Sequence, residues 1–324
     1  MRDTLVSILA HRRLQGIGST VLGIGLVLAG CGEQKVERPD AAPVFPDAAP
    51  IAEVVAPVPA AGPAYGVQTY LAVGVRGSLE ATITSSVGVE FGPALSQVVA
   101  RQLVWWLNPS RDLLPNDELE VVYELVKDEE PLVHSVWLDS KKLKKSLSAV
   151  RFRPQGTEFD RFFEPDGAEL EERLVGSPIE GYEQITSLLR DGRGHKGVDF
   201  KTPVGTPIVS PFAGTIVRKN WSVRANGDCV DVLTDQGMNA IFLHMNEVAK
   251  GIEVGAKVTK GQALGKTGNT GHSTAPHLHY QLEKQKKVLD PFNVHQTERR
   301  HLPKEQQAGL TASFERFSRL RKPK

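Results

Sequence analysis

Cysteine is scarce in this sequence, whose 324 residues include 2, Cys31 and Cys229. The two are not expected to pair, because Cys31 directly follows an apolar run near the start of the chain. Cys229 stands alone in the second half of the sequence, where we expect a small buried hydrophobic residue. A disulfide bond is therefore not what organises this chain.

The sequence also has little net charge. The formal value is +1, so no overall field would collect phosphate groups, which argues against a nucleic-acid-binding protein. Basic residues gather in 299–324, where a solvated tail is the ordinary interpretation. With 40% hydrophobic and 24% charged residues, the composition is globular, and the length suffices for two domains.

No apolar run here is comfortable as a membrane-spanning helix. The run Ile17–Ala29 follows the basic segment His11-Arg12-Arg13, an arrangement typical of a secretory signal. The residues Leu28-Ala29-Gly30-Cys31 resemble the bacterial lipobox, in which the cysteine is lipidated and becomes the new N-terminus. The alternative is a plain signal peptide with an incidental cysteine. Gly32, in place of Asp, favours the outer membrane by resemblance to the enterobacterial sorting pattern.

The composition changes several times along the chain. From Glu33 to about Ala64 it is rich in Pro and Ala and almost free of aromatic residues, as expected for an extended tether. We therefore predict five segments: a lipoprotein signal peptide (1–30), a tether (31–64), a small domain (65–175), a second domain (176–298) and a basic C-terminal helix or tail (299–324).

The segment 65–175 has the pattern of a small α+β domain. Helices are expected over 78–87 and 92–106, the second of them stopped by Asn108-Pro109. Strands are expected over 118–126, 132–138, 147–153 and 159–163. We find no catalytic pattern in this segment.

From Gly192 to about Pro291 the chain consists of short apolar runs broken by Gly and Pro, which predicts a domain of many short β-strands. After it, Leu310, Phe314, Phe317 and Leu320 recur at helical spacing. We expect this helix to pack on its own domain; a membrane-facing helix is the alternative.

The segment Pro276-His277-Leu278-His279-Tyr280 carries two histidines two residues apart. On a strand they would project from the same face. One interpretation is a metal ligand beside a catalytic base, and the other is a polar pair on a solvated face. Upstream, His195 and Asp199 bracket a glycine, and a His/His/Asp set suits zinc while leaving a fourth tetrahedral position for water.

These motifs, taken together and in order, resemble the LytM/lysostaphin-type zinc metallopeptidases, including the murein DD-endopeptidases. The resemblance rests on Gly194-His195-Lys196-Gly197-Val198-Asp199-Phe200, Pro203-Val204-Gly205-Thr206-Pro207, Gly261-Gln262-Ala263-Leu264-Gly265, Gly268-Asn269-Thr270-Gly271 and His277-Leu278-His279. It implies a mostly antiparallel β-sheet groove (a duplicated hybrid motif-like fold) with one catalytic Zn²⁺ on its floor.

By position, the resemblance implies that His195, Asp199 and His279 are the zinc ligands. It also implies that His277 and His244 are non-ligand histidines near the metal's water. His277 could then act as general base or orient the water, and His244, once protonated, could stabilise the oxyanion. A histidine at the edge of the core is the alternative for His244.

The resulting prediction is a zinc metalloendopeptidase that hydrolyses peptide cross-links of peptidoglycan, with D-alanyl–diaminopimelate bonds as the expected target. We expect it to be periplasmic and anchored to the outer membrane through Cys31, and we can name no regulatory protein partner. One alternative is a non-catalytic LytM-like activator of a peptidoglycan amidase. Another is a wall-binding lipoprotein in which zinc only stabilises the fold.

The region before the peptidase motifs carries a weaker resemblance. Gly77-Ser78-Leu79 and the run from Leu114 to Glu124 resemble the N-terminal regions of Gram-negative murein DD-endopeptidases. In some relatives such a region covers the active-site groove. The two resemblances imply a peptidase domain over 176–298 and a small regulatory or wall-binding domain over 65–175, and autoinhibition is a hypothesis for the latter.

Overall fold

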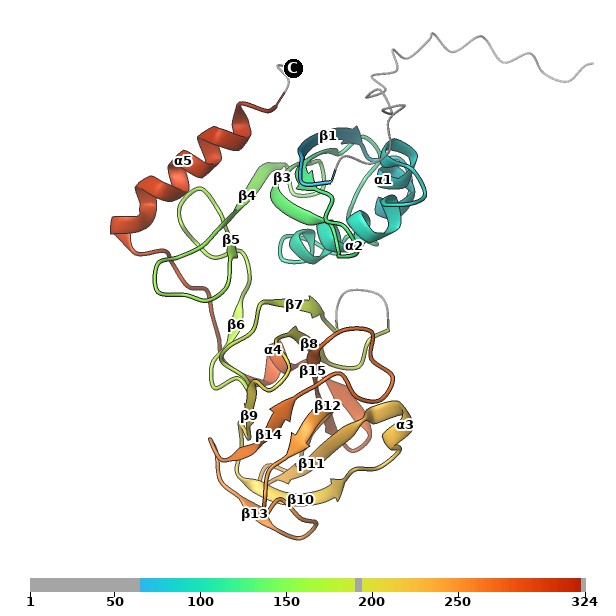
Figure 1. Cartoon of the computed structure of the whole chain (residues 1–324), viewed down its shortest axis with the longest axis vertical. Helices are drawn as coiled ribbons and strands as arrows, with labels where there is room; N and C mark the ends of the chain where they lie inside the picture. Colours follow the sequence, from blue (N-terminus) through green and yellow to red (C-terminus); the bar gives the residue numbers. More distant parts are fainter. Residues whose placement is uncertain (1–64, 190–193, 322–324) are drawn as a thin grey trace, which may run out of the picture. The chain divides into compact units, whose positions relative to one another are not determined.

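The computed structural model describes residues 65–189 and 194–321 (Figure 1). The predicted signal peptide, the tether and the lipidation site Cys31 lie outside these residues. Within the described ranges, no helix combines the length and the apolar character that crossing a bilayer requires.

The first part of the described chain is an antiparallel sheet with two helices. Its strands are β1 (Gln68–Gly74), β2 (Glu118–Glu124), β3 (Leu132–Ser140), β4 (Lys145–Phe152) and β5 (Arg161–Phe163), in that spatial order. The helices are α1 (Leu79–Val87) and α2 (Gly92–Leu103). The Ser78 hydroxyl caps α1 by accepting a hydrogen bond from the Ala81 amide. The predicted helices and strands are confirmed, and β1 is a strand that the sequence pattern did not reveal.

Both faces of this first sheet are covered. Alternation along β2 sends Leu119, Val121 and Tyr123 into a core shared with α1 and α2. The opposite face presents Val122, which packs with residues of α5 (Gln307–Ser318), the helix that follows the β domain in the chain.

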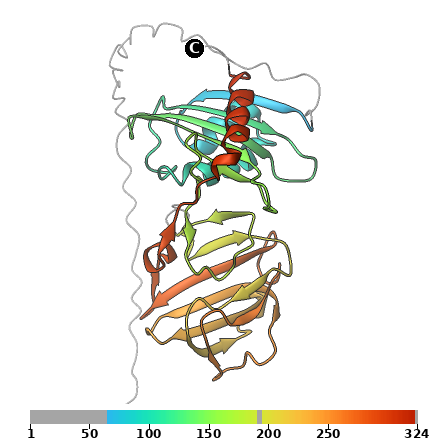
Figure 2. The same ribbon diagram turned by 90° about the vertical axis from the view of Figure 1, so that its left-hand side faces the viewer.

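Figure 2 shows α5 in red across the sheet. Its residues Leu310 and Phe317 are buried beside Trp137 and Val150. The expectation that this helix packs on its own domain is therefore wrong. The sheet's second face is apolar as well, and an apolar face must be covered by another element.

The second part is the predicted β domain. Its larger sheet runs in the order β13–β10–β11–β12–β15–β8–β7, with β14 pairing to β12 and β9, and β16 to β15. These strands are β7 (Gln184–Ser187), β8 (Val198–Lys201), β9 (Pro207–Val209), β10 (Gly214–Lys219), β11 (Asp228–Thr234), β12 (Asn239–Val248), β13 (Lys257–Val258), β14 (Ala263–Thr267), β15 (His277–Lys284) and β16 (Lys287–Leu289).

Short elements complete this part of the chain. They are α3 (Val223–Asn226), α4 (Pro291–Val294), η1 (Lys304–Gln306) and the strand pair β6 (Arg173–Leu174) with β17 (Thr297–Glu298). All pairings in the larger sheet are antiparallel, as predicted.

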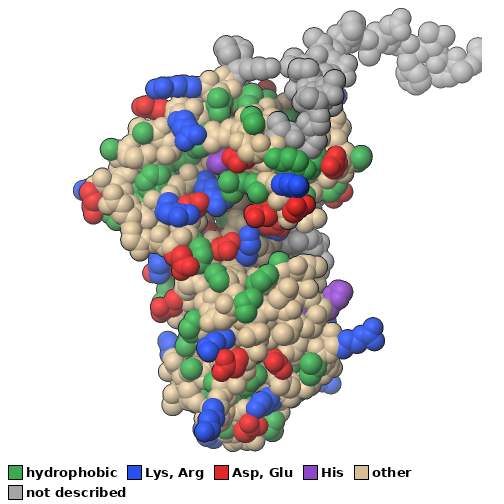
Figure 3. All heavy atoms as spheres, in the orientation of Figure 1, with side chains coloured by type: hydrophobic (Ala, Val, Ile, Leu, Met, Phe, Trp, Pro, Cys, Tyr) green, Lys and Arg blue, Asp and Glu red, His purple; other side chains and the backbone are tan. Residues whose placement is uncertain are grey.

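The core of the β domain lies on one face of β15. Leu278, Tyr280 and Leu282 point into it and are fully buried, so the intervening residues of the strand face the other way. Cys229 is also buried in this domain as a free thiol, as expected. On the face drawn in Figure 3, acidic and basic side chains are interspersed over the described surface.

Candidate active site

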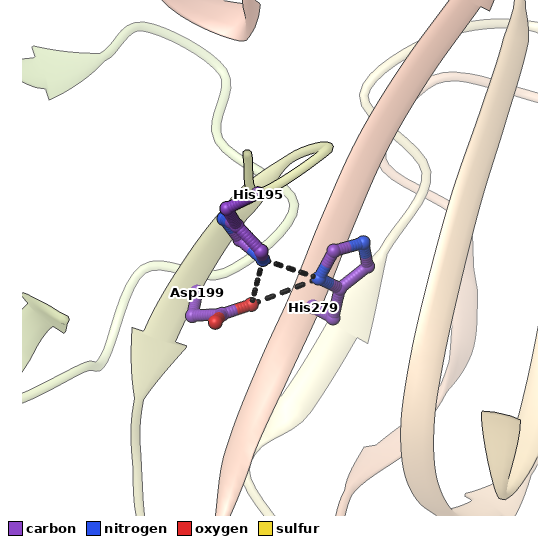
Figure 4. A group of neighbouring side chains, drawn as sticks. All are labelled: His195, Asp199 and His279. Atoms are coloured by element: carbon purple, nitrogen blue, oxygen red, sulfur yellow. Dashed lines mark hydrogen bonds and ion pairs between the residues drawn. The ribbon is translucent and has the colours of Figure 1, made fainter. Parts of the chain in front are cut away.

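Three predicted side chains converge beside β15, as Figure 4 shows. His195 Nε2 lies 3.0 Å from His279 Nδ1 and 3.1 Å from Asp199 Oδ1, and His279 Nδ1 lies 2.9 Å from the same carboxylate oxygen. We call this set of three atoms the donor triangle. The structure thus brings together the predicted ligand set, although its members come from segments about 80 residues apart.

Strand pairing explains how the triangle forms. Asp199 on β8 is directly opposite His279 on β15, so their side chains leave the sheet together. His195 reaches them from the turn before β8. That turn passes very close to β15: a Cβ on Gly197 would lie 2.4 Å from the Tyr280 carbonyl oxygen. Only glycine allows this approach, which accounts for the glycine between His195 and Asp199.

His277 lies beside the triangle without joining it. It projects from the same face of β15, and its Nε2 is 3.8 Å from Asp199 Oδ1. Its Nδ1 donates to the Ala275 carbonyl at 2.8 Å and is 3.1 Å from the Ser273 hydroxyl. With Nδ1 engaged in this way, Nε2 is the nitrogen that faces the site.

His244 reaches the site from β12 through an unusual backbone conformation. Its φ is 62°, in the left-handed region that non-glycine residues enter at a cost of about 1–2 kcal/mol. At this residue β12 changes partner, because Leu243 pairs with His279 on β15 whereas Met245 pairs with Thr267 on β14. The resulting turn of the chain puts the His244 ring 4.7 Å from that of His277, centroid to centroid.

The environment of His244 sets its protonation. Burial lowers the pKa of His244 to about 4, although its hydrogen bond to the Thr270 carbonyl acts in the opposite direction. At neutral pH the ring is therefore uncharged, with its proton on Nδ1, 2.9 Å from Thr270 O. The predicted oxyanion role requires His244 to gain a proton first.

The pKa of Asp199 is lowered as well, which for a carboxyl group favours the charged form. Burial alone would raise the pKa of its carboxyl, but hydrogen bonds with His195 and His279 hold this pKa well below its usual range. Asp199 is therefore a carboxylate at neutral pH, ready to bind a cation.

The donor triangle fits zinc. Two imidazole nitrogens and a carboxylate oxygen face one another at 2.9–3.1 Å, a spacing at which their lone pairs repel unless a proton or cation lies among them. Tetrahedral zinc ligands at about 2.0–2.2 Å from the ion lie roughly 3.3 Å from each other. With three protein donors, a fourth position would remain for water.

Several contacts of the site had no sequence signal. The Thr270 carbonyl that holds His244 and the Ser273 hydroxyl beside His277 both lie in the loop before β15. Gln281 Oε1 lies 3.1 Å from His279 Nε2, two residues further along the strand. The alternation used to pair His277 with His279 could have pointed to Gln281 as well.

Similarity to known proteins is found in the segment that carries the donor triangle. Residues 193–291 match the family described as Peptidase family M23. An "Uncharacterized metalloprotease" of Buchnera aphidicola subsp. Baizongia pistaciae is 36% identical over 100 residues, which are 31% of this chain and 26% of that protein. Lysostaphin of Staphylococcus simulans is 37% identical over 92 residues, 28% of this chain and 18% of that one.

A third relative extends beyond this segment. Peptidoglycan DD-endopeptidase ShyC of Vibrio cholerae is 25% identical over 225 residues, 63% of this chain and 49% of that protein. The chain thus spans about half or less of the length of these relatives. Together with the antiparallel sheet, the match shows that residues 193–291 are similar to M23 peptidase domains.

Proposed function

We propose that this protein is a zinc-dependent endopeptidase that hydrolyses peptide cross-links of peptidoglycan. The observation that carries the proposal is the donor triangle with two further histidines beside it. A bound zinc ion supplies Lewis acidity, lowering the pKa of a coordinated water to about 7 and polarising the scissile carbonyl. Relatives named as metalloprotease and as peptidoglycan DD-endopeptidase support this chemistry and this substrate class.

The chain's own residues divide the remaining work. His195, Asp199 and His279 would hold the ion. His277, with Nδ1 donating to the Ala275 carbonyl, presents Nε2 as a base toward the water's position. His244, on β12, presents a neutral Nε2 and would stabilise the oxyanion only once this nitrogen carries a proton.

The proposal extends to the bond and the location. D-alanyl–diaminopimelate cross-links are the expected target, since relatives are named DD-endopeptidases. Lipidation at Cys31 would place the enzyme in the periplasm, tethered to the outer membrane by residues 31–64. The location rests on the resemblance of residues 28–31 to the bacterial lipobox.

The rival functions predict different sites. An amidase activator that does not hydrolyse its substrate would not need a complete set of metal ligands with two further histidines beside it. A purely structural zinc site is usually closed by four protein ligands, whereas the described residues supply three at this place. Both features favour catalysis.

Incubating residues 65–324 with purified peptidoglycan tests the proposal. Muropeptide analysis should show the loss of cross-linked dimers, and a chelator should abolish this loss. His277→Ala should cut the rate on the order of 100-fold or more, the usual range for a general base. His301→Ala, which changes an exposed histidine outside the site, is the control. Unchanged dimers in all samples, including the fragment 176–298, would favour the activator.

A further inference from the structure

His279 uses its two ring nitrogens in opposite directions. Nδ1 belongs to the donor triangle, whereas Nε2 lies 3.1 Å from Gln281 Oε1. His279 and Gln281 are each 8% exposed, so bulk water competes little for this contact. The outer nitrogen of this ligand is therefore held by the protein itself.

The contact belongs to a polar row on β15. Leu278, Tyr280 and Leu282 occupy the core side of the strand. His279, Gln281 and Glu283 alternate with them, so these three side chains follow one another along the other face. The row leads from the donor triangle to the partly exposed Glu283.

Glu283 fixes which way the Gln281 amide points. The amide Nε2 of Gln281 donates to Glu283 Oε1, and a carboxylate can only accept. A flipped amide would set its oxygen against the carboxylate, which is repulsive. The amide oxygen must therefore face His279.

The amide oxygen in turn fixes the proton on His279. An amide oxygen only accepts, so His279 Nε2 must carry the hydrogen. With its Nε2 hydrogen held by this oxygen, His279 turns Nδ1, the atom in the donor triangle, toward the position where a metal ion would take its lone pair. His195 lacks such support: its outer nitrogen, Nδ1, is buried and has no hydrogen-bond partner among the described residues.

We propose that Gln281 and Glu283 are positioning residues that set the tautomer and the orientation of His279 for metal binding. The proposal rests on the zinc site of the proposed function, and it concerns metal affinity rather than catalysis. Outer partners of metal-ligating histidines are typically worth about 10- to 100-fold in metal affinity.

Zinc binding to residues 65–324 tests the proposal directly. The dissociation constant is measured by competition with a chromophoric chelator. Gln281→Leu removes the acceptor and should weaken zinc binding by about 10- to 100-fold. Gln262→Leu makes the same change in the same domain, where the side chain accepts from the Thr259 amide, and should keep the wild-type value.

Glu283→Ala provides a second variant, at a partly exposed position where a substitution disturbs the fold less than at buried Gln281. It leaves the Gln281 amide free to flip, so zinc affinity should fall by less than in Gln281→Leu. Nitrogen-15 NMR of the metal-free proteins should show a hydrogen on His279 Nε2 in the wild type and a partial loss of it in both variants.

Two results would overturn the proposal. One is a zinc affinity in Gln281→Leu and Glu283→Ala equal to that of Gln262→Leu. The other is weakened affinity with the His279 tautomer unchanged, which would indicate only a packing role. Neither readout uses peptidoglycan, so a failure of the proposed hydrolysis leaves this test intact.

Discussion

At the scale of single residues, sequence spacing and resemblance predicted which side chains meet, and the structure adds how each is oriented. His277 and His279 were an ambiguous pair in the sequence. In the proposed site, His279 is the metal ligand and His277 the neighbouring base, because it is His279 that lies directly opposite Asp199. The conformation of His244 could not be predicted, because it arises where β12 exchanges one partner strand for another.

The strained backbone at His244 gives a prediction that separates stability from activity. Both His244→Ala and His244→Gly should lose most cross-link cleavage. Glycine accepts a φ of 62° without strain, so His244→Gly should be more stable than His244→Ala by about 1 kcal/mol. Urea unfolding of the two variants measures this difference, and a more stable alanine variant would contradict the strain argument.

At the scale of elements, alternation and turn signals predicted most helices and strands of both sheets. Helical spacing likewise predicted α5, but not its location. An apolar stripe shows that a helix must be covered, and it does not specify by what. The surface that α5 covers is the second face of the first sheet. In the sequence of β2, the only sign of this apolar face is Val122, which lies between two residues that point into the other core.

Packing of α5 can be tested through Phe317, which is 4% exposed. Phe317→Ala should lower the free energy of unfolding of residues 65–324 by about 3 kcal/mol, as for other buried Phe→Ala changes. Leu320→Ala, at an exposed position just beyond the end of α5, is the control and should change this free energy by less than about 1 kcal/mol. Equal effects in a denaturant titration would show that α5 contributes little.

The same interface contains a titratable group, His134 on β3. Its ring stacks on Phe317 and its Nε2 lies 3.2 Å from a Glu124 oxygen, with Arg151 and Arg316 also near. Burial lowers the pKa of His134 in the folded protein despite Glu124. Its neutral form is thus favoured by folding, and this stabilisation is lost as pH falls below the unfolded value of about 6.5.

This pH dependence can be measured as a difference between two proteins. His134→Gln should be less stable than the wild type at pH 8, and the gap should shrink at pH 5. Thermal unfolding of both proteins at the two pH values provides the comparison. A gap that widens at pH 5 would mean that charged His134 is favoured in the fold.

At the scale of the whole molecule, the position of α5 changes how autoinhibition should be tested. A fragment that starts near Gly176 and keeps α5 would expose Leu310 and Phe317, which pack on the first sheet. Residues 176–298 avoid this exposure and retain nearly all of the peptidase core. If residues 65–175 cover the groove, this fragment should cleave cross-links faster than residues 65–324 at equal zinc loading. Equal rates in the same muropeptide assay would argue against autoinhibition.

Because α5 follows the peptidase in the chain yet completes the first sheet, the peptidase domain is inserted within the fold that precedes it. During synthesis, Val122 and Trp137 therefore remain exposed to solvent until the β domain and then α5 have been synthesised. A chain halted before α5 would therefore display an apolar sheet face, a surface that chaperones and proteases recognise. The first sheet would then remain a target for quality control until α5 has been synthesised and packed on it.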